Sequence, residues 1–322
     1  MKKLLYAFLL VLSQTALADF SVKKFELSSV KNISWSEIAS GFESVQRAEK
    51  TNIPVFLYTP TTVKPNSTAV VLMHGIGGLY NRYGERRIYF EYAEMLANQG
   101  ITVLVIDSHT SRGMGVANQT TATNVTVHTF VADVYNGLEY LRSLPHVNKD
   151  KIGLMGFSKG GLTTILATET RYRDAISPTK ANFAFHIPIY PGCQTFTKNP
   201  KLNGSPMLML LGEKDNYTGL SGCYEIQKIV PNTEIVVLKD ATHSWDEKIY
   251  SPIKINDGNS DLCRWKLDDS GLVYGGEELL SSSQANVGYI QKCLKKDDIY
   301  VVRNDAAFKQ GKELIVKFIN SR

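Results

Sequence analysis

Short apolar runs and helical patterns alternate along most of this 322-residue chain, and the alternation constrains its fold more than any other feature. Several runs are apolar throughout, which is typical of central strands in a parallel sheet covered on both faces. The candidate strands span residues 55–58, 69–73, 101–107, 151–156, 183–189, 207–211 and 234–239. The candidate helices span residues 86–99, 127–143, 160–169, 220–230 and 304–320. The alternation predicts the α/β class, with a doubly wound, mostly parallel sheet and helices on both faces.

Two segments fall outside this alternation. Residues 19–50 precede the first candidate strand, so we expect an N-terminal extension packed on the body. Residues 244–298 form a long stretch rich in Gly, Ser and Asp, and loops of this length in compact domains are usually functional or braced. Because no linker is visible, residues 51–322 are predicted to form one domain with an insertion at about 244–298.

The composition excludes several classes of protein. An apolar content of 43% and a charged content of 21% are near globular averages, which argues against disorder, collagen-like repeats and coiled coil. The net charge of +5 is small, and no long run of Lys or Arg occurs. A nucleic-acid partner is therefore not expected.

The first 18 residues have the three parts of a secretory signal peptide. Lys2 and Lys3 supply positive charge, residues 4–12 are apolar, and Ala16-Leu17-Ala18 provides a cleavage site before Asp19. A membrane anchor is the alternative, but the apolar run is shorter than the ~20 residues of a spanning helix. We therefore expect export to the periplasm or the extracellular space, with no membrane segment in the mature chain.

All four cysteines, Cys193, Cys223, Cys263 and Cys293, lie in the predicted mature chain. An even number of cysteines in an exported chain predicts disulfides. Four cysteines allow three pairings, of which the sequence-local one joins Cys193 to Cys223 and Cys263 to Cys293. A zinc site is the alternative, but no C-x-x-C pair occurs and the spacings are wide.

The candidate strand at residues 151–156 runs directly into Gly156-Phe157-Ser158-Lys159-Gly160-Gly161, and a candidate helix follows. A G-x-S-x-G motif between a strand and a helix is typical of a sharp turn that projects a nucleophilic serine above the sheet edge. The turn needs glycines because Cβ atoms would clash there, and the helix N-terminus favours developing negative charge. Ser158 is therefore the candidate nucleophile, and a structural glycine-rich turn is the alternative.

A nucleophilic serine needs a base and an orienting acid, which in this architecture follow it in the order Ser, Asp or Glu, His. Asp215 lies at the carboxyl end of one candidate strand, and His243 lies in the loop past the next. We therefore expect both to meet Ser158 at one edge of the sheet. His186 lies inside an apolar run and is expected to be a core residue. The other acids at these strand ends are Glu213, the runner-up as orienting acid, and Asp240 and Asp246, which are expected to cap turns.

An oxyanion hole needs two backbone N–H groups. Lys159 follows the nucleophile and supplies the first, and the turn His74-Gly75-Ile76-Gly77-Gly78 supplies the second. Ile76 is the first choice as donor and Gly77 the second, whereas His74 is expected to brace the loop. Arg112 is expected to bind a carboxylate or to join a salt bridge, and the salt bridge is favoured. The possible substrate-pocket residues are Gly77, His109, Arg112, Tyr190 and Trp245.

In their order along the chain, these motifs resemble those of the dienelactone hydrolase family, a branch of the α/β-hydrolases. The resemblance covers about residues 51–246 and the terminal helix. It implies the α/β-hydrolase fold and an esterase-like activity with Ser158 as nucleophile, His243 as base and Asp215 as acid. In related secreted members a Tyr-Pro-Gly-Cys turn accompanies a cysteine after the Asp motif, which supports pairing Cys193 with Cys223. The motifs are His74-Gly75-Ile76-Gly77-Gly78, Asp107-Ser108 with Arg112-Gly113, the Ser158 motif, Tyr190-Pro191-Gly192-Cys193, Leu211-Gly212-Glu213-Lys214-Asp215 and His243-Ser244-Trp245-Asp246.

The name-giving enzyme has Cys where this chain has Ser158, and residues 244–298 are longer than the family pattern, so the resemblance implies the reaction class rather than the substrate. The expected reaction is hydrolysis of a carboxylic ester or lactone through an acyl-enzyme, with no metal or organic cofactor. The expected partner is a small-molecule ester. The alternatives are a peptidase of the prolyl-oligopeptidase type, a lipase, and a non-catalytic binding protein on a hydrolase scaffold.

Overall fold

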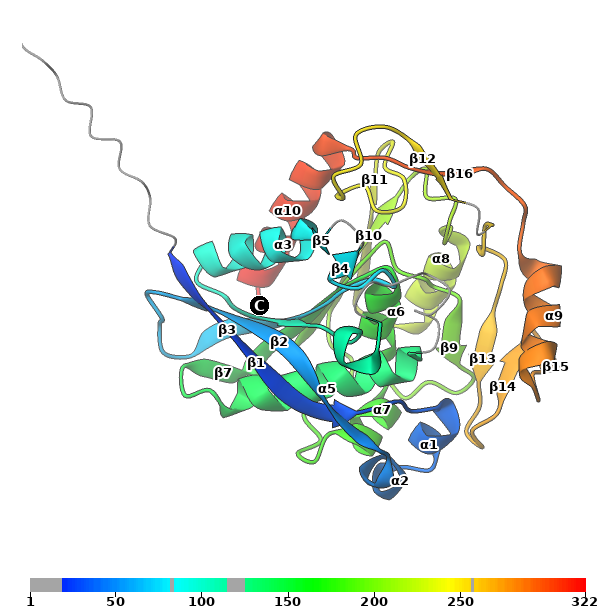
Figure 1. The fold of residues 1–322 in the computed structure, drawn as a ribbon, viewed down its shortest axis with the longest axis horizontal. Coiled ribbons are helices and arrows are strands. Elements are labelled where there is room, and N and C mark those ends of the chain that lie inside the picture. Colours follow the sequence, from blue (N-terminus) through cyan, green and yellow to red (C-terminus); the bar gives the residue numbers. More distant parts are fainter. Residues whose placement is uncertain (1–18, 82–83, 115–124, 256–257) are drawn as a thin grey trace, which may run out of the picture.

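The computed structural model describes residues 19–81, 84–114, 125–255 and 258–322 (Figure 1). Residues 1–18, for which a signal peptide is predicted, lie outside these ranges. Within the described ranges, no helix combines the length and the apolar character that crossing a bilayer requires.

A sheet of eight strands, counted over the described residues, forms the centre of the molecule in the order β1-β2-β6-β3-β7-β8-β10-β11. The strands from β6 to β11 in this order run parallel, whereas β1 and β2 join one edge in antiparallel pairing. The strands are β1 Phe20–Val30, β2 Lys50–Pro60, β3 Ser67–Met73, β6 Thr102–Ile106, β7 Val147–Phe157, β8 Phe185–Ile189, β10 Met207–Gly212 and β11 Thr233–Leu238.

Helices cover both faces of this sheet because strands send alternate side chains to opposite sides. In β3, Ala69, Val71 and Met73 join the apolar cluster that contains α5 (Val127–Ser143) and α7 (Thr170–Ile176). Val70 and Leu72 join the cluster that contains α3 (Arg87–Asn98) and α10 (Asp305–Asn320). Figure 1 shows α3 with α10 on one side of the sheet and α5 with α7 on the other. The central strands are therefore buried on both faces.

The predicted fold class is confirmed, since every candidate strand and every candidate helix overlaps an element of the expected type. The helix α5 has the predicted bounds, and the ends of the other candidate helices differ by no more than three residues. The remaining short elements did not stand out in the sequence. Among them are α1 Trp35–Ala39, α2 Phe42–Arg47, β4 Tyr80–Asn81, β5 Gly84–Glu85 and the 3₁₀ turn Thr110–Arg112.

Residues 19–50 are not an extension outside the sheet, which corrects the expectation from the sequence, because Phe20–Val30 forms the edge strand β1. This strand pairs antiparallel with β2 along its whole length. Its sequence includes Lys23, Lys24 and Glu26, so no continuous apolar run marks it. Charged residues are common on edge strands with an exposed face, which explains why the apolar criterion missed β1.

The predicted insertion, residues 244–298, is a folded subregion at the side of the body (Figure 1). Its strand β13 pairs with β14 and also with β9, which lies outside the insertion, and β12 pairs with β16. These elements and α8 are β9 Thr195–Thr197, α8 Ser221–Ile229, β12 Ile253–Ile255, β13 Trp265–Leu267, β14 Val273–Gly275, β15 Glu278–Leu279, α9 Ser283–Cys293 and β16 Ile299–Val301. The disulfide Cys263–Cys293 connects the segment just before β13 to the end of α9. The disulfide Cys193–Cys223 connects the loop after β8 to α8.

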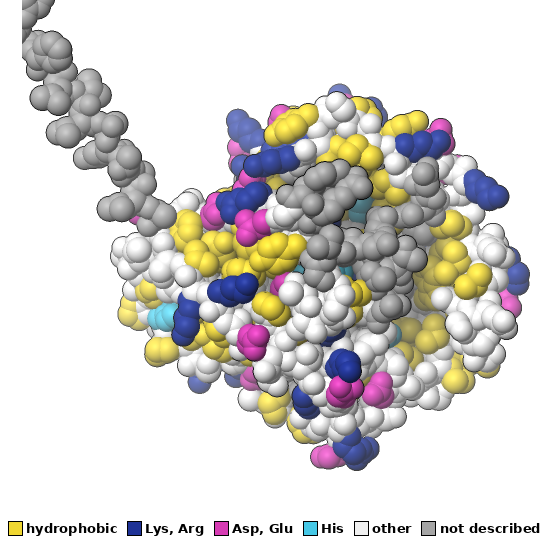
Figure 2. Space-filling view, viewed as in Figure 1, with side chains coloured by type: hydrophobic (Ala, Val, Ile, Leu, Met, Phe, Trp, Pro, Cys, Tyr) yellow, Lys and Arg dark blue, Asp and Glu magenta, His cyan; other side chains and the backbone are white. Residues whose placement is uncertain are grey.

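Charged side chains of both signs are interspersed on the face seen in Figure 2, and Lys and Arg do not gather there in one large patch. Several of the charged residues are paired on the surface, as in Arg87 with Glu94 and Lys248 with Glu91. Among the described residues of this face, Lys and Arg therefore form no continuous basic stripe of the kind that typically marks a nucleic-acid-binding surface.

Candidate active site

Ser158 occupies a sharp turn between β7 and α6 (Lys159–Leu166). Its backbone has φ 52° and ψ −111°, a conformation that non-glycine residues adopt rarely and at some cost in free energy. Gly160 is required beside it because a Cβ there would lie 2.5 Å from the carbonyl oxygens of Met73 and His74. The local sequence thus places the hydroxyl of Ser158 above the carboxyl ends of the strands, as expected for a nucleophile turn.

Three side chains from separate strand ends form a hydrogen-bonded series. His243, in the loop after β11, has Nε2 at 3.0 Å from the Ser158 Oγ. Its Nδ1 lies 2.8 Å from the Oδ2 of Asp215, which follows β10. His243 is 4% exposed and Asp215 is 5% exposed, so bulk water does not separate these groups. The structure therefore brings together the three residues that the sequence analysis selected for nucleophile, base and acid.

Asp215 is held as a carboxylate by its surroundings. Its burial alone would raise the pKa, but the charge and hydrogen bond of His243 and two backbone N–H groups lower the pKa below the ordinary value. Those N–H groups belong to Tyr217 and Thr218, and the Thr218 hydroxyl donates a further hydrogen bond at 3.0 Å. An ionised, immobile Asp215 can fix the orientation of the His243 ring and favour its protonated form.

The predicted oxyanion loop lies directly against Ser158. A Cβ on Gly75 would lie only 3.3 Å from the Ser158 Cβ, and Ile76 lines both of the cavities that reach the serine. The loop is held by His74, whose Nε2 accepts a hydrogen bond from the Ser108 N–H at 3.1 Å. Backbone N–H groups of Ile76 and Lys159 are thus close to the nucleophile, and their role as oxyanion donors stays a prediction.

The runner-up acids lie away from the histidine. The Glu213 carboxylate accepts a hydrogen bond from the backbone N–H of Asp240, and Asp240 pairs with Lys214 on the surface. His186 lies in β8 and is completely buried, as expected for a core residue, and burial lowers its pKa to about 3. None of these three side chains contacts Ser158 or His243 among the contacts of the described residues.

Only two of the five possible pocket residues line the larger cavity beside Ser158. Gly77 and Tyr190 do so, whereas His109, Arg112 and Trp245 are absent from the described linings of both cavities at the serine. Trp245 is fully buried and His109 is 2% exposed, so both are core residues. Among the described residues, these three side chains therefore form no part of the wall of either cavity, and for Arg112 this agrees with the favoured expectation of a salt bridge.

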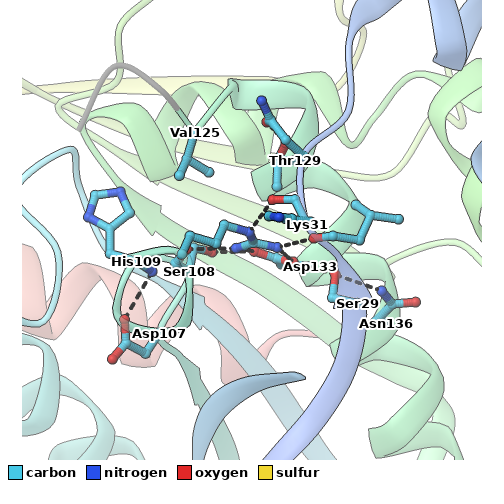
Figure 3. Close-up of polar contacts among 12 residues, drawn as sticks. Ser29, Lys31, Asp107, Ser108, His109, Val125, Thr129, Asp133 and Asn136 are labelled. Carbon is cyan, nitrogen blue, oxygen red and sulfur yellow. Dashed lines mark hydrogen bonds and ion pairs between the residues drawn. The ribbon is translucent and has the colours of Figure 1, made fainter. Parts of the chain in front are cut away.

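Arg112 takes the structural role instead of binding a carboxylate from solution. Its guanidinium forms a two-pronged ion pair with Asp133 of α5, with both N···O distances 2.8 Å. The hydroxyls of Ser29 and Ser108 donate to the same carboxylate (Figure 3). Arg112 also donates to the carbonyl oxygen of Val30 at the end of β1. The cluster thus joins β1, α5 and the loop after β6.

The sequence analysis expected Asp246 to cap a turn, and this expectation is wrong. The side chain is fully buried beneath the site. Its carboxyl accepts hydrogen bonds from the Tyr190 hydroxyl at 2.7 Å and the Tyr92 hydroxyl at 3.1 Å. The Tyr190 ring in turn packs edge-on against His243, with 4.9 Å between ring centroids. Burial, together with the nearby charge of Glu247, raises the pKa of Asp246 to about 7. No local pattern in the sequence pointed to this buried acid.

We expect this raised pKa to make folding stability depend on pH. Between pH 3.8, the ordinary pKa of the group, and about pH 7, Asp246 keeps its proton in the folded state and has lost it in the unfolded chain. The stabilisation that is present at low pH is therefore lost as the pH rises through about 7. Asp246→Asn removes this term, because an amide does not titrate. Denaturant unfolding of both proteins between pH 4 and pH 8 should show the variant gaining about 4 kcal/mol relative to the wild type as pH rises. Parallel curves would contradict the shift.

Two cavities meet at Ser158. The first has a volume of about 470 Å³, contains His243 and the oxyanion loop, and receives Ile253, Lys254 and Ile255 from the insertion. The second has a volume of about 380 Å³ and receives Gly258, Ser260 and Leu294 from the insertion. Residues 244–298 therefore form part of the wall of each cavity.

This chain is similar to several known proteins. The family model for the prolyl oligopeptidase family matches residues 89–178, a stretch that includes the Ser158 turn. A protein from Klebsiella pneumoniae subsp. pneumoniae that is assigned as a dienelactone hydrolase has a solved structure. It aligns with a TM-score of 0.55 and 13% identity, over 94% of this chain and 100% of that one. The apo form of Thermogutta terrifontis esterase 2 aligns with a TM-score of 0.48 and 20% identity, over 62% of this chain and 82% of that one. A search of curated proteins finds no match.

The structural alignment covers nearly the whole chain, and the family match covers the part that carries the nucleophile turn. Together, these findings show that the chain has the predicted α/β-hydrolase fold, and that its match to the prolyl oligopeptidase family is limited to the part that contains the Ser158 turn.

Proposed function

We propose that this chain hydrolyses carboxylic esters or lactones through an acyl-enzyme on Ser158. The observation that carries the proposal is the hydrogen-bonded series from Asp215 through His243 to the Ser158 hydroxyl. His243 accepts the serine proton through Nε2 while the Oγ attacks the carbonyl carbon, and Asp215 stabilises the resulting imidazolium. The N–H groups of Ile76 and Lys159 donate to the oxyanion.

His243 completes the cycle by moving protons in both directions. It first donates its proton to the leaving alcohol oxygen, which leaves the acyl group on Ser158. It then accepts a proton from water, so that hydroxide attacks the acyl carbonyl, and it returns this proton to the Ser158 Oγ as the acid leaves. Every proton in this scheme passes through Nε2, the atom that lies 3.0 Å from the serine oxygen.

A peptidase of the prolyl-oligopeptidase type is the second candidate, because that family's model matches residues 89–178. The match surrounds the nucleophile turn, a part that acyl-transfer enzymes on this fold share whatever their leaving group. The ester assignment is supported by the resemblance of motifs outside that region, in particular those at Asp215 and His243. Export to the periplasm or the extracellular space is part of the proposal and is supported by the signal-like residues 1–18 and the two disulfides.

The proposal is tested by labelling the folded protein with a fluorophosphonate and locating the adduct by peptide mass spectrometry. We expect one adduct, on Ser158, that is absent after denaturation and in His243→Ala, since only an activated serine reacts. Ester and proline-containing anilide substrates with the same chromophore then separate the two candidates. Failure of the folded protein to react would contradict the proposal and favour the alternative that the chain is a non-catalytic binding protein.

A further inference from the structure

The two cavities that meet at Ser158 differ in chemistry. The first is lined by Arg86 and Lys254 as well as by tyrosines and isoleucines. The second is mainly aliphatic, and its side chains include Val127, Leu162 and Leu294. No Asp or Glu occurs among the described residues that line either cavity. The first cavity therefore favours an anionic group and the second an alkyl chain.

The position of His243 determines which part of an ester each cavity holds. His243 must protonate the leaving oxygen, so the leaving group lies on the histidine side of the serine. His243 lines the first cavity and is absent from the lining of the second. The leaving alcohol therefore belongs in the first cavity and the acyl chain in the second.

Arg86 is the cation best placed to meet the leaving group. Its Nη2 lies 2.5 Å from the Oε1 of Glu247, and the two side chains are only 21% and 13% exposed. Its Nη1 lies against the oxyanion loop, because a Cβ on Gly77 would lie 1.8 Å from that atom. Its Nε is buried without a hydrogen-bond partner among the described residues. A guanidinium has five N–H donors, so Arg86 can bind a second carboxylate while it stays paired with Glu247.

The second cation of this cavity is less suited to that role. Lys254 also pairs with an acid, Asp298, but its side chain is 48% exposed, so water screens its charge more than that of Arg86. Lys159 lines the second cavity, but its ammonium group donates to the Val125 carbonyl oxygen and lies 4.7 Å from the Phe130 ring centroid. The aliphatic character of the second cavity is therefore preserved near Leu162.

We propose that the substrate is an ester of an apolar carboxylic acid with a hydroxy acid, whose free carboxylate is bound by Arg86. Water and the ester give the apolar acid and the hydroxy acid, with the acyl group carried on Ser158 between the two steps. The proposal rests on the proposed function and adds the substrate class. Arg86 then determines specificity for the leaving group, and the cavity that contains Leu162 and Leu294 determines the acyl chain.

The test compares two substrates that differ in one charge, 4-hexanoyloxybenzoate and 4-hexanoyloxybenzamide. Arg86→Gln is expected to lower kcat/KM for the benzoate about 10- to 100-fold and for the amide less than threefold, since it removes a charge-assisted hydrogen bond. Glu247→Gln is expected to act in the opposite direction, raising kcat/KM for the benzoate about 3- to 10-fold, because Arg86 then carries an uncompensated charge. Comparing each variant with wild type on the same substrate removes the difference in leaving-group reactivity.

Arg87→Gln is the matched control. It removes the same charge from the next residue, but Arg87 is 45% exposed and pairs with Glu85 and Glu94 away from the cavity. Its kinetics should stay within twofold of wild type on both substrates. Equal losses on both substrates in Arg86→Gln and Glu247→Gln would overturn the proposal, because they would show a purely structural ion pair. Selective loss on mono-4-nitrophenyl adipate, whose carboxylate lies on the acyl arm, would overturn it as well.

A readout without turnover separates this proposal from the proposed function. 4-Hydroxybenzoate should protect Ser158 from the fluorophosphonate in wild type, more strongly than 4-hydroxybenzamide does, and the difference should vanish in Arg86→Gln. Labelling without such selective protection would overturn the substrate class while leaving the serine hydrolase intact. Absence of labelling on the folded wild type would instead refute the proposed function.

Discussion

Ser158→Ala is expected to lower kcat for ester hydrolysis by about 10⁴- to 10⁶-fold while the protein stays folded. The variant loses the oxygen that carries the acyl group, so only oriented water and the oxyanion donors remain to act on the carbonyl. The structure predicts little effect on folding, because Ser158 is only partly buried and the hydrogen bond of its hydroxyl is to His243. Ala and Ser adopt this strained backbone conformation equally poorly. The free-energy cost of the strain is therefore about the same in the variant and in the wild type.

Asp215→Asn gives a graded comparison in the same assay. An amide keeps the geometry but offers an N–H where the carboxylate accepts from His243, so the wrong tautomer is favoured and kcat should fall by about 10⁴-fold. Ser321→Ala, at an exposed position near the C-terminus, serves as the control and should behave like wild type. Retention of more than a tenth of the activity in Ser158→Ala, after contaminating hydrolases are excluded, would remove Ser158 from the mechanism.

The elements that carry these residues could be predicted because their signals are local. Buried parallel strands are continuous apolar runs, so β3, β6, β8 and β10 stand out in the sequence. The turn at Ser158 is specified within six residues, and the strand order then brings Asp215 and His243 to the same edge. Local sequence was therefore sufficient to select the three residues of the hydrogen-bonded series.

The walls of the site could not be predicted because their contacts are non-local. Arg86 and Glu247 are 161 residues apart in the chain, and Tyr190 and Asp246 are 56 apart, so no spacing rule connects them. The same limit applies to Arg112, for which the sequence favoured a salt bridge but did not identify the partner, Asp133 in α5. The direction of a loop side chain depends on the partners that distant parts of the fold place beside it. Local sequence patterns in a single chain do not identify those partners.

Asp133→Ala is expected to lower the free energy of unfolding by about 3–5 kcal/mol. The Asp133 side chain is fully buried and that of Arg112 is 3% exposed, so removal of the carboxylate leaves a guanidinium charge without a counterion in the protein interior. The hydroxyls of Ser29 and Ser108 lose their acceptor in the same step (Figure 3). Unsatisfied buried groups account for most of the cost of breaking such a pair.

Glu49→Ala is the matched control. Glu49 pairs with Lys31, which directly follows β1, but both side chains are mostly exposed. Its removal should change stability by less than about 1 kcal/mol. The double variant Arg112→Met/Asp133→Leu should regain much of the loss, since it removes the unpaired charge as well as the carboxylate. Urea unfolding of the four proteins measures these differences, and a loss below 1 kcal/mol in Asp133→Ala would contradict the prediction.

The same variants separate stability from chemistry. The Asp133 cluster contacts the site only indirectly, because Ser108 donates from its backbone to His74, which holds the oxyanion loop. Below its unfolding transition, Asp133→Ala should therefore retain kcat within about tenfold of wild type and should still react with the fluorophosphonate at Ser158. Ser158→Ala should show the reverse, with near wild-type unfolding and no adduct. Because the ion pair is connected to the oxyanion loop only through Ser108 and His74, and the catalytic series does not include it, each variant is expected to change one property and spare the other.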